Sequence, residues 1–408
     1  MTDSTFYRAV GVFDAVRPGM RAGAGILVRD GRVVAVGPPE EACPPGATRV
    51  DLGEVYLVPG FVDAHTHVTI RPGDGDQHGQ LQQPAAWQTV RGVDNLRRML
   101  LSGVTTARIM TEEHDIDVHF KAAVRAGEVA GPALRVAGRG LSPTGKHGSA
   151  AGGVDGPDAA REAVRTNAAK GADHIKIFTT GGVSSTDTSL AESNYSAEDI
   201  AAIVFAAAEL GLMVSAHAHG GAGVDLAAAG GVRSIEHGAL LTEQNLDTMT
   251  RHGTWLVLTN TILFHPTGIE QGDASEPAIL AKVRQARAAM EASADRVRAA
   301  GVPIALGTDS MHGLFGYEMQ WLVEHGWSPE EALLAGTVRG ADLMDVQDIG
   351  ALAPGRRADF VALLRNPLTD IGAVREVAGV FRSGNQVVDA NGYTRPAPPA
   401  PTHREEHP

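Results

Sequence analysis

The sequence predicts a (β/α)8 TIM barrel with a small β-sandwich domain built from both chain ends. Between residues 59 and 350, short apolar runs alternate with Gly-rich polar loops and amphipathic helices, which is the pattern of repeated strand-helix units. Eight such runs occur in a span somewhat longer than the ~250 residues typical of this barrel. The expected strands are 61–68, 104–110, 133–137, 174–179, 213–219, 234–237, 254–260 and 303–309.

The segments between these runs have helical composition and periodicity, as in 159–170, 197–210 and 281–300. The run Ser-Pro-Glu-Glu at 328–331 places a cap, a first-turn proline and a capping-box glutamate in the order that starts a helix. A doubly wound open sheet is the alternative architecture. No Gly-rich dinucleotide fingerprint follows the first strand, and we therefore expect the barrel.

Both ends of the chain have the pattern of short β-strands. Near the N-terminus, two runs of Val, Ile and Leu flank Asp30-Gly31, which is a strong hairpin signal. Similar runs return after residue 349, and the Pro-rich C-terminal end has little to bury. The predicted segments are an N-terminal sandwich part at 1–58, the barrel at 59–350, a C-terminal sandwich part at 351–394 and a flexible tail at 395–408.

The composition favours one large enzyme that binds neither nucleic acid nor membranes. With 408 residues, 43% of them hydrophobic, the chain can bury a sizeable core. The net charge of -13 and the absence of a long basic run argue against nucleic acid. We find no export signal and no run that could span a bilayer. The single cysteine, Cys43, cannot form an internal disulfide, so we expect a cytoplasmic protein.

Two histidines one residue apart, His65 and His67, lie in the first expected barrel strand. Alternate side chains of a strand point to the same face, so both can reach one metal ion. A pair of unrelated surface histidines is the alternative interpretation. It weakens because similar side chains recur in the other strands.

Catalytic residues of such barrels lie at the C-terminal ends of the strands, and metal-ligand residue types gather there. Four imidazoles and one carboxylate from four strands suit Zn²⁺ or a similar divalent ion. These predicted ligands are His65, His67, His217, His237 and Asp309. Lys176 lies between two isoleucines in the fourth strand, where a buried cation is costly without a partner. One explanation is an ion pair between Lys176 and a carboxylate such as Asp309.

With these motifs the chain resembles the amidohydrolase superfamily, in particular its prolidase-like and imidazolonepropionase-related members with a binuclear centre. The resemblance extends from the N-terminal sandwich strands through His65 and His67 to the run 350–360. It implies two divalent metal ions, with Zn²⁺ expected, and carbamylation of Lys176 to N6-carboxylysine. The modified lysine and a hydroxide would bridge the ions.

The resemblance also implies how the ligands divide between the two ions. The more buried ion would be bound by His65, His67 and Asp309, and the more exposed ion by His217 and His237.

Further roles follow for residues around this centre. Asp309 is expected to accept the proton during attack and to return it to the departing amine. His219, on the same strand face as a ligand, is the expected oxyanion donor and also a substrate contact, the alternative being a rim histidine bonded to a backbone carbonyl. The resemblance makes His147 a substrate-binding residue, although Lys146 replaces the glycine usual before it. His265 is expected at the entrance, with a solvated loop histidine as the alternative.

The expected reaction is hydrolysis of an amide that joins an acyl group or amino acid to a C-terminal amino acid. Substrates would be dipeptides, N-acyl amino acids or ochratoxin-like amides, and the resemblance implies a homo-oligomer. Imidazolonepropionase generally works with one metal and lacks the bridging lysine, so Lys176 favours the binuclear amide hydrolases. A cyclic amidohydrolase or a deaminase is one alternative. A non-catalytic scaffold that metal ions only stabilise is the other.

Overall fold

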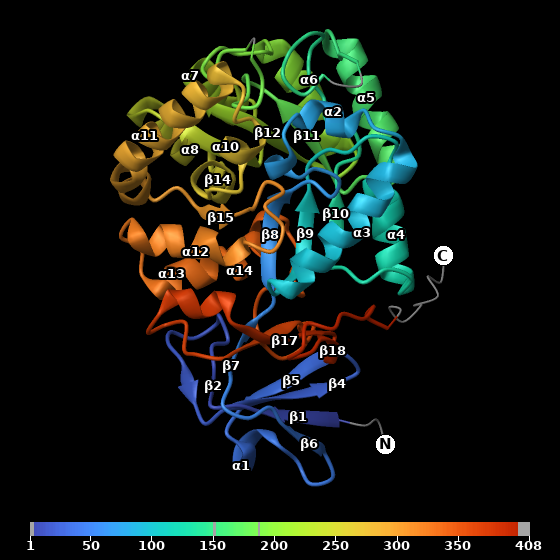
Figure 1. The fold of residues 1–408 in the computed structure, drawn as a ribbon, viewed down its shortest axis with the longest axis vertical. Helices are drawn as coiled ribbons and strands as arrows, with labels where there is room; N and C mark the ends of the chain where they lie inside the picture. The colour runs from blue at the N-terminus through green and yellow to red at the C-terminus, as the bar shows by residue number, and fades with distance from the viewer. Residues whose placement is uncertain (1–3, 150–151, 187, 399–408) are drawn as a thin grey trace.

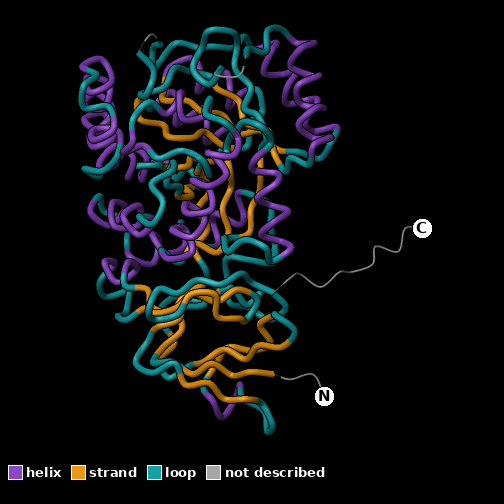
Figure 2. Tube along the Cα trace, turned by 45° about the vertical axis from the view of Figure 1, so that its right-hand side comes forward, coloured by secondary structure: helices purple, strands orange, loops and turns teal. Residues whose placement is uncertain are grey.

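The structure, a computed structural model, describes residues 4–149, 152–186 and 188–398. A barrel ringed by helices sits against a smaller unit of strands formed by both chain ends (Figures 1 and 2). This arrangement confirms the predicted fold class. The exact segment bounds stay predictions, and residues 399–408 of the predicted tail lie outside the described residues.

Eight parallel strands form the barrel, and each predicted run overlaps one of them. They are β8 (Phe61–Thr66), β9 (Val104–Ile109), β10 (Ala133–Val136), β11 (His174–Phe178), β12 (Met213–Gly220), β13 (Ser234–Leu240), β14 (Trp255–Leu258) and β15 (Ile304–Leu306). Pairing is continuous from β8 to β10 and from β11 to β15. A bridge between Leu141 and Ile177 joins these two groups, and the Asp309 amide donates to the His65 carbonyl at 2.9 Å. These two links close the barrel.

Helices surround the strands, and the three predicted helical segments fall on α5, α6 and α11. The helices of this part are α2 (Gln77–Leu81), α3 (Ala85–Leu101), α4 (Ile116–Ala126), α5 (Pro157–Lys170), α6 (Ala197–Glu209), α7 (Gly221–Ala229), α8 (Glu243–His252), α9 (Thr261–Phe264), α10 (Ile269–Gly272), α11 (Pro277–Ala300), α12 (Phe315–Glu324), α13 (Pro329–Ala335) and α14 (Val338–Leu343), with a 3-10 turn at Pro72–Asp74. Ser328 and Glu331 form the predicted capping box at the start of α13.

The β-sandwich consists of a four-stranded sheet, in the order β5-β4-β1-β6, and a six-stranded sheet, in the order β18-β17-β16-β7-β2-β3. Their elements are β1 (Ser4–Arg8), β2 (Gly11–Val12), β3 (Arg21–Ala22), β4 (Gly25–Arg29), β5 (Arg32–Gly37), α1 (Pro39–Ala42), β6 (Thr48–Asp51), β7 (Tyr56–Pro59), β16 (Phe360–Leu363), a 3-10 turn (Ile371–Arg375), β17 (Val377–Arg382) and β18 (Asn385–Val388). Because β16 pairs with β7, both chain ends share one sheet. The predicted hairpin is confirmed, with φ of 51° at Asp30 and 73° at Gly31.

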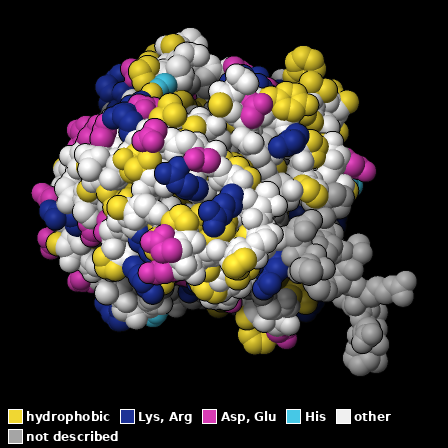
Figure 3. Space-filling view, turned by 90° about the horizontal axis from the view of Figure 1, so that it is seen from below, with side chains coloured by type: hydrophobic (Ala, Val, Ile, Leu, Met, Phe, Trp, Pro, Cys, Tyr) yellow, Lys and Arg dark blue, Asp and Glu magenta, His cyan; other side chains and the backbone are white. Residues whose placement is uncertain are grey.

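The surface at the sandwich end carries Lys and Arg side chains interspersed with Asp and Glu (Figure 3). Apolar side chains are scattered between them on the same face. Within the described parts of the chain, no helix combines the length and apolar character needed to cross a bilayer.

The contact between β8 and β15 is close because Gly307 lies directly against His65. A Cβ at Gly307 would come within 2.5 Å of the His65 Cβ and 2.7 Å of its backbone nitrogen. We expect Gly307→Ala to push the two strands apart and to lower the free energy of unfolding by about 1–3 kcal/mol, measured by urea unfolding. At Gly37 the nearest atom would be 3.5 Å away, so Gly37→Ala is the control. Equal effects in both variants would contradict this close contact.

Candidate active site

Most of the predicted site residues converge at the C-terminal end of the barrel, around one cavity that we call the inner cavity. Eight of the nine line it: His65, His67, His147, Lys176, His217, His219, His237 and Asp309. They come from β8, β11, β12, β13 and the loops after β8, β10 and β15. Parallel barrel strands bring these ends together although the residues are far apart in the sequence.

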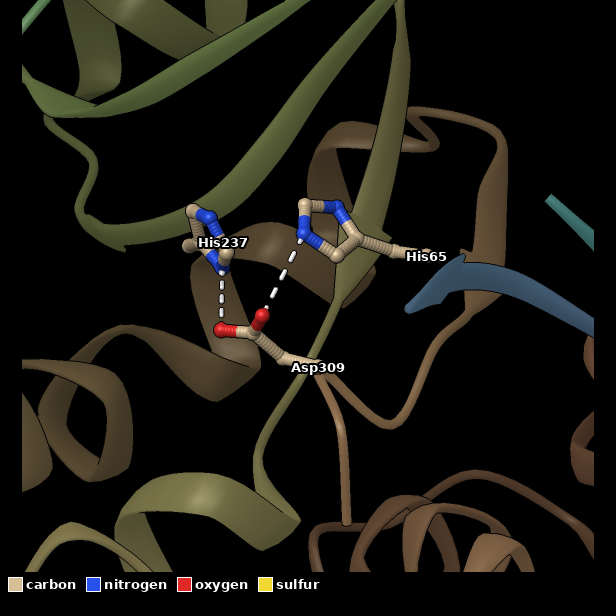
Figure 4. A group of neighbouring side chains, drawn as sticks. All are labelled: His65, His237 and Asp309. Atoms are coloured by element: carbon tan, nitrogen blue, oxygen red, sulfur yellow. Dashed lines mark ion pairs between the residues drawn. The ribbon is translucent and has the colours of Figure 1, made fainter. Parts of the chain in front are cut away.

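Asp309 lies at the centre of the cluster, and its carboxylate faces His65 and His237 (Figure 4). Its Oδ1 is 3.5 Å from His65 Nε2 and 3.4 Å from His67 Nε2, and its Oδ2 is 3.8 Å from His237 Nδ1. Backbone φ is 46° at Asp309 and 73° at His237, a left-handed conformation that is uncommon outside glycine and concentrates at functional sites. Ligand atoms of His65, His237 and Asp309 lie within 4.8 Å of one another, so this group could hold a metal ion.

The four predicted imidazole ligands each have one ring nitrogen engaged by the surrounding protein. The pairs are His65 Nδ1 with Glu236 Oε2 at 2.7 Å, His67 Nδ1 with the Thr111 carbonyl at 3.0 Å, His217 Nε2 with the Gly181 carbonyl at 3.2 Å, and His237 Nδ1 with Thr259 Oγ1 at 2.8 Å. A carbonyl or carboxylate only accepts, so the nitrogen facing it carries the proton and the other keeps a lone pair. For His65, His67 and His217 this is the usual support of metal-binding histidines. The Thr259 hydroxyl beside His237 can donate or accept and does not fix which nitrogen carries the proton. His65 Nε2 is buried without a hydrogen-bond partner among the described residues, as a free ligand atom would be.

Lys176 is buried in β11, with 1% of its surface exposed. Its Nζ lies 5.2 Å from the centre of the Phe178 ring. Within the described ranges its amine makes no ion pair and no hydrogen bond, so a salt bridge to Asp309 does not explain it. Burial lowers the pKa of Lys176 to about 8, which raises the share of neutral amine near neutral pH.

His219 and His147 both line the inner cavity, and the centres of their rings lie 4.9 and 4.6 Å from the centre of the His217 ring. Both ring nitrogens of His219 are buried without a partner in the described structure, so it is not bonded to a backbone carbonyl. Burial lowers the pKa of His219 to about 4, and the neutral ring therefore has one N–H to donate near pH 7. The His147 Nδ1 lies 2.6 Å from Ser185 Oγ. Lys146 lines a separate outer cavity that shares His147 with the inner one.

His265 is the predicted site residue that the structure does not bring to the inner cavity. It follows α9, its Nδ1 lies 2.8 Å from Thr267 Oγ1, and its ring packs on Tyr317 at 4.8 Å. Its substrate role stays a prediction. His174 lies deeper in the barrel, where its Nε2 donates to the Ile109 carbonyl at 3.0 Å, and His114 and His119 are exposed.

Several residues of the site were not predicted. His78 on α2 lines the inner cavity, and Glu236 with Arg108 lies behind His65. The wall also contains the apolar residues Ile70, Leu81, Phe178, Val183, Ile262, Leu263, Ile269 and Met290, together with the polar residues Gln77, Thr111, Glu113, Ser184 and Thr259. Glu236 and Arg108 carried a usable signal, because a charge inside a buried strand needs a partner. The apolar wall residues carried none that distinguishes them from core.

Glu318 fixes the turn after β14 that carries Ile262 and Leu263. Its Oε2 accepts from the Asn260 amide at 2.8 Å and its Oε1 from the Thr261 amide at 2.6 Å. Burial raises the pKa of Glu318 from 4.5 to about 8. The folded chain therefore holds this proton more tightly than the unfolded chain, and stability is lost as pH rises from about 4.5 through 8.

We expect Glu318→Gln to remove this part of the pH dependence. Urea unfolding of the metal-free protein at pH 5 and pH 9 measures it. Between pH 5 and pH 9 the free energy of unfolding should fall more in the wild type than in the variant, because glutamine does not ionise. A difference between variant and wild type that stays constant over this range contradicts the prediction.

The fold and the site define a barrel hydrolase that acts on amide bonds. The chain belongs to the Amidohydrolase family, whose sequence profile matches residues 56–387. This family is generally dependent on a binuclear metal centre, and His65, His237 and Asp309 form a possible metal site in this member.

Similar proteins include three kinds of hydrolase. The chain is 31% identical over 372 residues to ochratoxinase from Aspergillus niger, covering 80% of this chain and 75% of that protein. The crystal structure of A. niger ochratoxinase matches with a TM-score of 0.83 at 26% identity, over 95% of this chain and 96% of that one. The crystal structure of a Xaa-Pro dipeptidase with bound methionine in its active site matches with a TM-score of 0.86 at 25% identity, over 94% of this chain and 99% of that one. Imidazolonepropionase from Salinispora arenicola is 26% identical over 379 residues, covering 85% and 86%.

Proposed function

We propose that this protein is a metal-dependent amide hydrolase that releases a C-terminal amino acid from a dipeptide or an N-acyl amino acid. The observation that carries the proposal is the convergence of four imidazoles, Asp309 and Lys176 on one cavity whose wall also contains apolar side chains. Lys176 makes no ion pair with any described residue. Similarity to a Xaa-Pro dipeptidase and to ochratoxinase supports an amide of this class. A homo-oligomeric state and a cytoplasmic location are part of the same proposal.

The proposed ligands divide into two sets. His65, His67 and Asp309 would hold one ion, His217 and His237 the other, and Lys176 carboxylated by CO₂ would lie between them. Carboxylation joins the lysine nitrogen to CO₂ and releases one proton. When bound, two divalent ions, with Zn²⁺ expected, polarise the amide carbonyl and lower the pKa of the attacking water.

Two side chains carry the proton and the charge of the reaction. As water adds to the amide carbon, the Asp309 carboxylate accepts its proton and then passes it to the amide nitrogen while the C–N bond breaks. The N–H of His219 donates to the carbonyl oxygen, where negative charge develops. The apolar side chains in the wall limit the access of bulk water, which strengthens both interactions. The products are a carboxylic acid and an amine.

His219→Ala is expected to lower kcat/KM by about 10²-fold to 10³-fold and to leave the zinc content unchanged. The loss arises because a donor to the oxyanion is removed while the proposed ligands stay. Kinetics together with zinc analysis by mass spectrometry measure both effects, and His219→Gln, which keeps an N–H donor, should recover part of the rate. Loss of zinc in step with activity would show that His219 is a ligand instead.

A substrate panel tests the function itself. The zinc-loaded protein is given dipeptides, N-acyl amino acids and ochratoxin-like amides, with cyclic amides and amino-substituted heterocycles as the contrasting set. Release of a free amino acid from the first set is the expected result. The similarity to imidazolonepropionase makes cyclic amides the second candidate, and turnover confined to them would replace the proposal. If the zinc-loaded protein turns over no substrate and chelation lowers its Tm, the metal ions only stabilise a non-catalytic scaffold.

A further inference from the structure

Behind the inner cavity, three buried side chains from three barrel strands form a continuous chain of hydrogen bonds. Arg108 on β9 donates from Nη2 to both carboxylate oxygens of Glu236 on β13, at 2.9 and 3.1 Å, and from Nε to the Ala64 carbonyl at 2.6 Å. Glu236 Oε2 in turn lies 2.7 Å from His65 Nδ1. The three side chains are at most 4% exposed.

The direction of these hydrogen bonds is fixed by the chemistry of the groups. A guanidinium only donates, and a carboxylate only accepts. His65 Nδ1 must therefore donate to Glu236, which leaves the lone pair on Nε2, the atom that faces Asp309 at 3.5 Å. His67 and His217 are oriented by neutral backbone carbonyls. His65 differs because its partner is a buried carboxylate, which is costly to bury without a cation beside it.

We propose that Arg108 and Glu236 are a positioning pair that sets the tautomer of His65 and so prepares its Nε2 for a metal ion. Arg108 compensates the buried charge and keeps both carboxylate oxygens turned so that Oε2 accepts from His65. The Ser234 hydroxyl also donates to Glu236 Oε1 and accepts from Arg108 Nη1 at 3.2 Å, so it supports the same arrangement. This inference depends on the proposed function only in taking His65 as a metal ligand.

Glu236→Gln should reverse the direction of the hydrogen bond to His65 Nδ1 without changing the shape of the side chain. Glutamine offers one carbonyl oxygen and one amide NH₂. The Oε1 position receives the shorter Arg108 contact, at 2.9 Å, and the Ser234 hydroxyl as well. We therefore expect the glutamine oxygen there and the NH₂ toward His65 Nδ1, which must then accept. The His65 proton moves to Nε2 and blocks the ligand atom. In the double variant Arg108→Met/Glu236→Gln, the glutamine oxygen is free to rotate back to His65, and the original tautomer returns.

The first measurement is ¹⁵N NMR of histidine-labelled, metal-free protein, with the His65 signals assigned through His65→Gln. We expect Nδ1–H in the wild type, Nε2–H in Glu236→Gln and Nδ1–H again in the double variant. The second is zinc affinity by competition with a chelator. We expect a loss of about 10-fold to 100-fold in Glu236→Gln and recovery of most of it in the double variant. If the substitutions only damaged the fold, the double variant would bind zinc more weakly than Glu236→Gln, because it loses more buried contacts.

The control is Asp173→Asn, which removes the carboxylate that Lys121 contacts at 2.8 Å outside the cavity and should leave zinc affinity unchanged. Nε2–H in the wild type overturns the proposal, as does a folded double variant that binds zinc no better than Glu236→Gln. If the double variant does not fold, the tautomers of the wild type and Glu236→Gln still decide. Neither measurement uses turnover, so a failed substrate panel would overturn the proposed function and leave this inference standing.

Discussion

Lys176→Met is expected to lower kcat/KM by about 10³-fold or more, which corresponds to ~4 kcal/mol of transition-state stabilisation. Methionine fills a similar volume beside Phe178 but cannot react with CO₂, so the proposed bridging carboxylate is lost. The barrel should remain folded, because the Lys176 amine makes no ion pair or hydrogen bond in the described structure that the substitution would break. Kinetics and zinc analysis measure the loss, and we expect less bound zinc per chain.

The modification itself is observable in the wild type. Protein loaded with zinc in ¹³C-labelled bicarbonate should give a carbamate carbon signal in ¹³C NMR that is absent from Lys176→Met. Lys121→Met serves as the control, because Lys121 is paired with Asp173 outside the cavity. Lys176→Ala should regain part of its activity when a short carboxylic acid is added, since the acid can occupy the vacated space. An unmodified amine in a fully active, zinc-loaded enzyme contradicts the prediction.

The convergence of the candidate ligands on one cavity could be predicted from the sequence because strand geometry is local. Two histidines at positions i and i+2 share a face whatever the rest of the fold does, which places His65 with His67 and His217 with His219. Position along the strand was harder to predict. Asp309 lies three residues beyond the end of β15, where its amide bonds to the His65 carbonyl, and such a contact between distant segments has no local signature.

The surroundings of the ligands depend on tertiary contacts that periodicity does not encode. Met290 reaches the inner cavity from the middle of α11, and in sequence it is one more apolar residue on a helix face. His265 shows the reverse case. A histidine after a barrel strand is well placed for a cavity, yet the short helix α9 turns it outward onto Tyr317. Loops and short helices therefore determine which side chains line the wall of the inner cavity, while the strands position most of the predicted ligands.

Asp117 serves as a control for Asp309. It distinguishes the loss of a proton shuttle from the loss of any buried carboxylate. Asp117 is also buried, and its Oδ2 accepts from the Gly138 amide at 2.8 Å away from the inner cavity. Asp117→Asn removes a buried charge of the same type and should keep kcat close to the wild-type value. Asp309→Asn changes the same few atoms inside the cavity.

Asp309→Asn is expected to lower kcat by about 10³-fold to 10⁴-fold, because an amide cannot accept a proton from water or return it to the leaving nitrogen. The asparagine oxygen can still face His65 and His67, so part of the zinc should remain. Anilide substrates with amines of graded basicity test the shuttle directly. Without a proton donor the leaving amine must depart unassisted, so the rate should depend more steeply on its basicity than in the wild type. Wild-type kcat, or an unchanged dependence on the leaving group, would show that the proton travels by another route.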